Sequence, residues 1–123
     1  MLVGSFYIIN ELKIEGGEVS AKIELQSHHP IFEGHFPGEP VMPGVTMIRI
    51  CEEILSESLK IQYRIKESKS IKFLSIINPI ENPSLEIFIQ FKPQDNQLIA
   101  DFSFIKSDGV VSFKMNATLL NWD

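Results

Sequence analysis

Apolar and polar side chains recur with two different periods along the chain, and each change of period marks a new element. Residues 5–14 and 19–25 alternate on either side of a Gly-Gly pair, which predicts a β-hairpin. Residues 45 to about 60 instead place apolar side chains at helical spacing, which predicts one helix with a broad apolar side. That side holds Met47, Ile48, Ile50, Cys51, Ile54, Leu55 and Leu59, and the other holds Arg49, Glu53, Ser56 and Lys60.

A period of two returns after the helix and continues towards the C-terminus. The strands predicted from it cover residues 71–75, 85–92, 98–105 and 110–120, separated by Pro-Gln-Asp-Asn and Ser-Asp-Gly breaks that favour tight turns. The order is therefore two strands, one helix and four strands. So many strands bury a single helix only if a curved antiparallel sheet wraps around it. We therefore expect one α+β domain that spans residues 1–123.

The composition is that of an ordinary folded domain, and it narrows the choice of partners. The 123 residues carry a formal net charge of −5, which argues against nucleic acid as a partner. The N-terminal residues show no basic region, and no apolar stretch is long enough to cross a membrane, so neither a signal peptide nor a membrane span is expected. Cys51 is the one cysteine, which excludes an internal disulfide and favours a cytoplasmic location.

The positive charge is concentrated in one window. Residues 60–72 hold five of the eleven basic residues and one acidic residue, Glu67, so the rest of the chain is markedly acidic. The five are Lys60, Arg64, Lys66, Lys69 and Lys72. One interpretation is a solvated strand face, and the other is a docking patch for an acidic partner.

A loop rich in proline and glycine precedes the helix. Residues 26–44 hold four prolines and three glycines and are expected to be ordered but irregular. The loop ends at Pro43 and Gly44, where the first N–H groups of the helix have no internal partner and the helix dipole is positive. A developing oxyanion would be stabilised there, and His35, nine residues before Gly44, could act as a general base. A lone histidine in a loop is nevertheless more often structural than catalytic.

Two short strings in this loop keep prolines and glycines at fixed positions. They are HFPG at residues 35–38 and PVMPGV at residues 40–45, with PIF and Gly34 upstream. Together they closely resemble the signature of the (3R)-hydroxyacyl-acyl-carrier-protein dehydratases of the FabA/FabZ type. That family has the hotdog fold, a sheet wrapped around one long helix, and forms dimers with two sites at the interface. The resemblance implies a dehydratase (a hydro-lyase) that acts on acyl carrier protein or another acyl thioester in fatty-acid or polyketide-type metabolism.

The resemblance also assigns roles to individual residues. His35 would remove a proton from the carbon next to the thioester, and the carbonyl oxygen of Val41 would hold its other ring nitrogen. The backbone N–H of Gly44 would bind the thioester oxygen, and a carboxylate on the helix of the neighbouring subunit would protonate the leaving β-hydroxyl. No metal or organic cofactor is implied, and His28 and His29 are expected to be loop residues rather than ligands.

One position departs from the family pattern. The family's carboxylate lies fourteen residues after the catalytic histidine, and here that position is Arg49, which stays protonated and is a poor acid. Glu52 or Glu53, a turn deeper on the helix, could supply the acid instead, although an ordinary i,i+4 pair with Arg49 is the favoured fate of Glu53. If neither does, restoring the acid with Arg49→Glu should raise dehydration, provided that the rest of the site is intact.

Two further explanations stay open. A heterodimer with a related hotdog subunit could take the base from this chain and the acid from the partner, whereas an unaided homodimer should be weak. Alternatively, the chain binds acyl thioesters or carrier protein without turnover. Thioester hydrolysis, which other families of this fold perform, ranks last because the HFPG string indicates dehydration. Arg64, Lys66 and Lys69 are the expected contacts for an acidic carrier protein.

Overall fold

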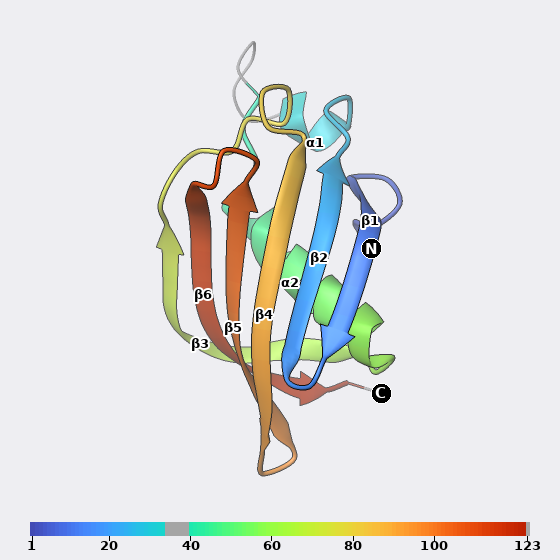
Figure 1. Ribbon diagram of the computed structural model, residues 1–123, viewed down its shortest axis with the longest axis vertical. Helices are drawn as coiled ribbons and strands as arrows, with labels where there is room; N and C mark the ends of the chain where they lie inside the picture. Colours follow the sequence, from blue (N-terminus) through green and yellow to red (C-terminus); the bar gives the residue numbers. More distant parts are fainter. Residues whose placement is uncertain (34–39, 123) are drawn as a thin grey trace.

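Six antiparallel strands form one sheet with the order β1-β2-β4-β5-β6-β3, and a long helix crosses one of its faces (Figure 1). This computed structural model describes residues 1–33 and 40–122. The strands are β1 (Tyr7–Glu15), β2 (Glu18–Leu25), β3 (Tyr63–Phe73), β4 (Ser84–Gln94), β5 (Gln97–Lys106) and β6 (Val111–Asn121). The helices are α1 (Pro30–Glu33) and α2 (Gly44–Leu59). The predicted α+β architecture is confirmed, with β1 and β3 as the two edge strands.

Helix α2 begins at the Pro43-Gly44 step that the sequence indicates. Pro43 adopts an extended conformation, and its carbonyl accepts hydrogen bonds from the backbone N–H of Thr46 at 3.1 Å and from the Thr46 hydroxyl at 2.6 Å. The helix ends at Leu59, and the next residue, Lys60, has a φ of 58° in the left-handed region that stops helical hydrogen bonding. Its 16 residues therefore span about 24 Å, so its two ends present separate chemical environments.

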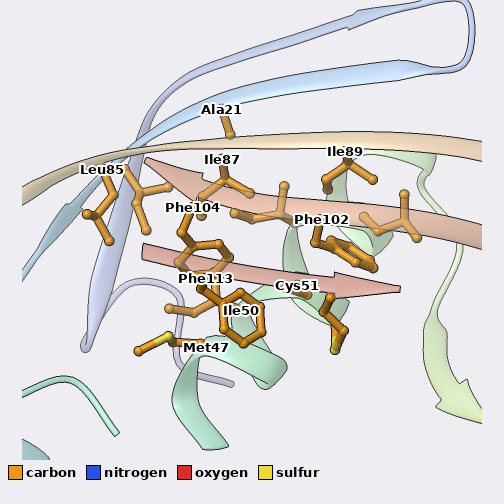
Figure 2. Packing of buried hydrophobic residues seen from close by; sticks show 14 of the residues in the cluster. Ala21, Met47, Ile50, Cys51, Leu85, Ile87, Ile89, Phe102, Phe104 and Phe113 are labelled. Atoms are coloured by element: carbon orange, nitrogen blue, oxygen red, sulfur yellow. The ribbon is translucent and has the colours of Figure 1, made fainter. Parts of the chain in front are cut away.

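The core lies between α2 and the inner face of the sheet. Met47, Ile50 and Cys51 on the helix face Phe102, Phe104 and Phe113 on β5 and β6, and these side chains are buried (Figure 2). The rings of Phe104 and Phe113 meet edge to face, 5.0 Å apart. Each large apolar side chain buried here contributes roughly 1.5–3 kcal/mol. Burial also raises the pKa of the Cys51 thiol well above its usual value, so Cys51 is a packing residue rather than a nucleophile.

The strand after the helix differs from the prediction. It begins at Tyr63 instead of near Ile71, and it ends at Phe73, so Ser75 lies outside it. Its pairing with β6 shifts at two bulges, where Lys66 and Lys69 have no Cα partner on the neighbouring strand. Because each bulge inserts a residue, the alternation of apolar and polar positions is broken over the first half of β3.

Two smaller differences concern the loop and the polar side of the helix. The predicted irregular loop contains α1, where the backbone N–H of Ile31 donates to Nδ1 of His29 at 3.1 Å. His29 therefore has a local structural contact, as expected of a loop residue. Glu53, predicted on the polar side of the helix, is buried, because the N-terminal residues fold over it.

Candidate active site

The N-terminal end of α2 contacts the end of β3 and the segment that follows it. The backbone N–H of Met42 donates to the carbonyl of Ile77 at 2.8 Å, which fixes the chain just before the helix. The ring of Phe73 lies against Gly44, so closely that a Cβ on this glycine would come within 2.8 Å of it. Glycine therefore leaves the backbone here accessible beside an aromatic wall, as an oxyanion-binding N–H requires.

A groove opens next to this end of the helix. Its volume is about 520 Å³. Its lining includes Val41, Ile76, Ile80 and Lys106. His35, the predicted base, lies outside the described residues, so its role rests on the sequence string alone. Val41 and Gly44 are the predicted site residues that the structure brings together at this end.

Arg49, at the family's acid position, makes two ion pairs within its own helix. Its Nε lies 3.1 Å from Oε2 of Glu53, and its Nη1 lies 3.1 Å from Oε1 of Glu52. The predicted pairing of Glu53 with Arg49 is confirmed. Because the side chain of Arg49 is 23% exposed and flanked by two carboxylates, its charge is locally compensated.

Glu53 is held by the N-terminal segment as well. Its carboxylate accepts hydrogen bonds from the backbone N–H groups of Leu2 at 2.7 Å and Val3 at 2.8 Å, and from the hydroxyl of Tyr7 at 3.0 Å. Burial and the negative charge of Glu53 raise the pKa of Tyr7, which therefore stays a protonated donor. Since these donors lie about fifty residues away in the sequence, helical periodicity alone does not reveal the cluster.

Glu52 is bound in a similar way, by strand β3. Its Oε2 accepts a hydrogen bond from the backbone N–H of Ile65 on β3 at 2.8 Å, while its Oε1 pairs with Arg49. All four carboxylate oxygens of Glu52 and Glu53 therefore have donors. These contacts favour the explanations in which the chain does not supply its own acid.

A second cavity lies beside α2, and Arg49 and Glu53 form part of its lining. They line the space of about 760 Å³ between the helix, β1 and the N-terminal segment, together with Val3, Leu12 and Ile61. This cavity contains neither Val41 nor Gly44, so it is separate from the predicted reaction centre. The sequence did not indicate it, because the N-terminal segment closes it only through tertiary contacts.

The predicted carrier contacts lie along β3. Lys66 and Lys69 are exposed, whereas Arg64 is half-buried and its Nε has no hydrogen-bond partner among the residues that the structure describes. Phe73, at the other end of the strand, touches Gly44. At about 3.3 Å per residue, Arg64 lies up to about 30 Å from Phe73 along the strand, and Lys69 about 13 Å. The basic residues thus extend away from the Gly44 end of the helix.

Two other kinds of site are absent from the residues that the structure describes. Within residues 1–33 and 40–122, no histidine, cysteine, aspartate and glutamate side chains gather in a group that could hold a metal ion. Over the same part of the chain, no helix has the length and apolar character that a membrane crossing requires.

Arg49→Glu is expected to destabilise the protein, because it replaces the cation between Glu52 and Glu53 with a third carboxylate. We expect a loss of about 2 kcal/mol or more in the free energy of unfolding, measured with urea, and a smaller loss for Arg49→Gln. Restoring the family's acid by this change alone should therefore not give a fully active isolated chain. A variant as stable as the wild type would show that the two ion pairs contribute little.

Sequence comparisons place these features among known proteins. The family model described as ApeI-like, ApeI dehydratase, matches residues 11–115. A 3-hydroxyacyl-[acyl-carrier-protein] dehydratase FabZ of Syntrophobacter fumaroxidans is 30% identical over 109 residues, which cover 86% of this chain and 67% of that protein. The protein of the same description from Caulobacter sp. strain K31 is 42% identical over 55 residues, which cover 42% of this chain and 32% of its own length. The match thus spans about a third of the Caulobacter relative.

Solved structures confirm the predicted hotdog fold. The chain resembles a structure described as the dehydratase heterocomplex ApeI:P from Xenorhabdus doucetiae, with a TM-score of 0.78, 19% identity and coverage of 93% of this chain and 97% of that one. It also resembles a hypothetical thioesterase with coenzyme A from Streptococcus pneumoniae, with a TM-score of 0.70, 17% identity and coverage of 94% and 84%. At these identities the similarity establishes the fold and not the reaction.

Proposed function

The chain belongs to the ApeI-like dehydratase family, and from this membership we propose that it is one subunit of an enzyme that removes water from β-hydroxyacyl thioesters. The FabZ relatives are described as dehydratases of hydroxyacyl groups on acyl carrier protein, which supports a carrier-bound substrate. A thioester of the same acyl group on a carrier other than acyl carrier protein would undergo the same reaction. The product in either case is a trans-2-enoyl thioester and one water molecule.

This chain contributes the groups that act on the thioester side of the substrate. His35 takes the proton from the carbon next to the thioester, and the Val41 carbonyl orients its ring. The Gly44 N–H, beside the ring of Phe73, stabilises the negative charge that develops on the thioester oxygen. The groove of about 520 Å³ along Val41, Ile76 and Ile80 is the proposed path by which the thioester reaches Gly44.

The acid comes from a partner subunit. The observation on which this depends is that Arg49 occupies the family's acid position and is paired with both nearby carboxylates. The leaving β-hydroxyl needs a proton donor, and an arginine cannot provide one near neutral pH. A related hotdog subunit with a carboxylate at this helix position would complete the site, and the similarity to a dehydratase heterocomplex supports such a pairing.

A second candidate function follows from the same observation. A chain whose Arg49 is held by two glutamates could bind an acyl thioester or its carrier without converting it. The predicted contacts of Arg64, Lys66 and Lys69 with an acidic carrier protein remain a prediction in both cases.

The reaction product separates the candidates. The chain, alone and mixed with a related hotdog subunit that carries the helix carboxylate, is incubated with a β-hydroxybutyryl thioester. Dehydration is followed by the absorbance of the enoyl thioester, and hydrolysis by release of the free thiol. The proposal predicts enoyl formation in the mixture and little in the chain alone. Thiol release would instead indicate a thioesterase, and saturable binding without either product would indicate a binding subunit.

A further inference from the structure

The ring of Phe73, the last residue of β3, lies against the start of helix α2. A Cβ on Gly44 would lie 2.8 Å from both Cε1 and Cζ of this ring, and 3.7 Å from Cε2. Since the nitrogen and the Cβ of a residue share one Cα, the end of the ring also lies within about 5 Å of the Gly44 nitrogen. Phe73 is nevertheless 57% exposed, so a large part of it is open to a ligand bound at Gly44.

The position of this ring is fixed by a second ring and by the backbone that follows it. The rings of Phe73 and Phe113 lie 5.4 Å apart, and Phe113 is fully buried. The backbone N–H of Leu74 donates to the carbonyl of Ser112 at 2.8 Å, and the hydroxyl of Ser75 donates to that of Ser112 at 2.9 Å. Because Ser112 is itself buried, Phe73 is held as a wall beside Gly44.

The backbone donors beside this wall have no acceptor of their own. The N–H of Thr46 bonds to the carbonyl of Pro43, but those of Gly44 and Val45 donate to no acceptor in residues 1–33 or 40–122. Such N–H groups at the start of a helix can bind a carbonyl oxygen and stabilise negative charge on it.

An N–H that binds the thioester oxygen favours two different reactions. One is loss of a proton from the neighbouring carbon, which leads to dehydration. The other is hydrolysis, in which water adds to the carbonyl carbon, the C–S bond breaks, and a carboxylic acid and a thiol are released. Negative charge develops on the same oxygen in both reactions, so the Gly44 N–H does not choose between them. Access of water to the carbonyl carbon does.

We propose that Phe73 selects dehydration over hydrolysis, because its ring covers the carbonyl carbon of a thioester bound at Gly44 and excludes water from it. The inference rests on the proposed function, since it requires the thioester oxygen at the Gly44 N–H. An apolar ring offers a water molecule no hydrogen-bond partner. Proton removal from the neighbouring carbon consumes no water, so the same ring leaves dehydration possible.

Phe73→Ala tests the inference in the isolated chain, because hydrolysis requires neither the acid nor the partner subunit. The wild type and the variant are incubated with a β-hydroxybutyryl thioester, and free thiol is detected with a chromogenic disulfide. One oxyanion-binding donor contributes about 10²–10³-fold to acyl transfer. We therefore expect the variant to release thiol at least about tenfold faster than the wild type. In the mixture with the partner subunit, the ratio of thiol to enoyl product should also rise.

Two further variants control for folding and for the loss of an exposed ring. Phe73→Leu keeps part of the apolar wall, so it should give a smaller rise, and it covers the case in which Phe73→Ala folds poorly. Phe88 is 40% exposed on β4 and alternates with the buried Ile87 and Ile89, so its side chain points away from α2. Phe88→Ala should release thiol at the wild-type rate.

A second change shows whether the thiol is released at this site. Gly44→Pro removes the N–H, and proline is accepted at the first position of a helix. Pro43 already has the extended conformation that the residue before a proline requires. In the Phe73→Ala background, the ring that a proline Cβ would meet is gone. The double variant should therefore fold and return thiol release to the wild-type rate.

Three results would overturn the inference: unchanged thiol release by folded Phe73 variants, an equal rise in Phe88→Ala, or a rise that persists after Gly44→Pro. Dehydration is measured separately, as enoyl thioester in the presence of the partner. A rise in thiol release without any enoyl product would refute the proposed dehydration and keep the shielding by Phe73. Normal dehydration with unchanged thiol release would refute the shielding alone.

Discussion

Replacing Glu53 with alanine is expected to lower the free energy of unfolding by about 3–5 kcal/mol, the range for removing one partner of a buried charge pair. The side chain of Glu53 is 4% exposed, and its loss leaves the N–H groups of Leu2 and Val3, the hydroxyl of Tyr7 and the Nε of Arg49 without this acceptor. Arg49 keeps its ion pair with Glu52. Unsatisfied buried donors each cost about 1–3 kcal/mol. The N-terminal segment should detach from α2 as a result.

A neighbouring glutamate provides the matched control. Glu57 lies one turn further along the same helix and pairs with Lys60 at 2.7 Å, but both side chains are more than half exposed. Exposed pairs of this kind contribute little, so Glu57→Ala should change stability by less than about 1 kcal/mol. Urea unfolding of both variants measures the difference. Equal effects would mean that Glu53 is not the structural anchor of the N-terminal segment.

His35→Ala is expected to lower the rate of enoyl thioester hydration by the partnered enzyme about 10²–10⁴-fold, the usual contribution of a general base. The measurement is the initial rate with a trans-2-enoyl thioester and saturating partner. His28→Ala is the matched control, because His28 is an exposed histidine of the same loop region that lies outside the HFPG string. The control should keep close to the full rate. Comparable losses in the two variants, or none in either, would remove His35 from the mechanism.

Features encoded by nearby residues could be predicted from the sequence. The helix was recognised because its apolar side chains recur at helical spacing over 16 residues, and the structure buries Met47, Ile50 and Cys51 as that spacing requires. The Pro43-Gly44 step predicts a helix start at Val45, within one residue of the observed start at Gly44, because a proline there acts on the backbone of its immediate neighbours.

Features that depend on distant residues could not be predicted. The burial of Glu53 comes from Leu2, Val3 and Tyr7, which reach it only after the sheet has curved around the helix. The start of β3 was missed because the bulges at Lys66 and Lys69 interrupt its alternation. Arg49 is recognisable from the sequence as a departure from the family pattern, and its ion pair with Glu52 is a local i,i+3 contact. The hydrogen bond between Glu52 and Ile65 on β3 is the long-range contact that the sequence does not reveal.

The measurement that tests the central claim most directly is complementation between two incomplete subunits. The claim is that this chain supplies the base and the oxyanion-binding N–H, and that a partner supplies the acid. The chain is mixed with a related hotdog subunit that keeps its helix carboxylate but has its own catalytic histidine changed to alanine, and hydration of a trans-2-enoyl thioester is recorded. The account predicts that neither protein alone exceeds background appreciably, that the mixture is at least about 10²-fold faster, and that His35→Ala in this chain abolishes the gain. Full turnover by the isolated wild-type chain, or a mixture with no gain despite formation of the complex, would contradict it.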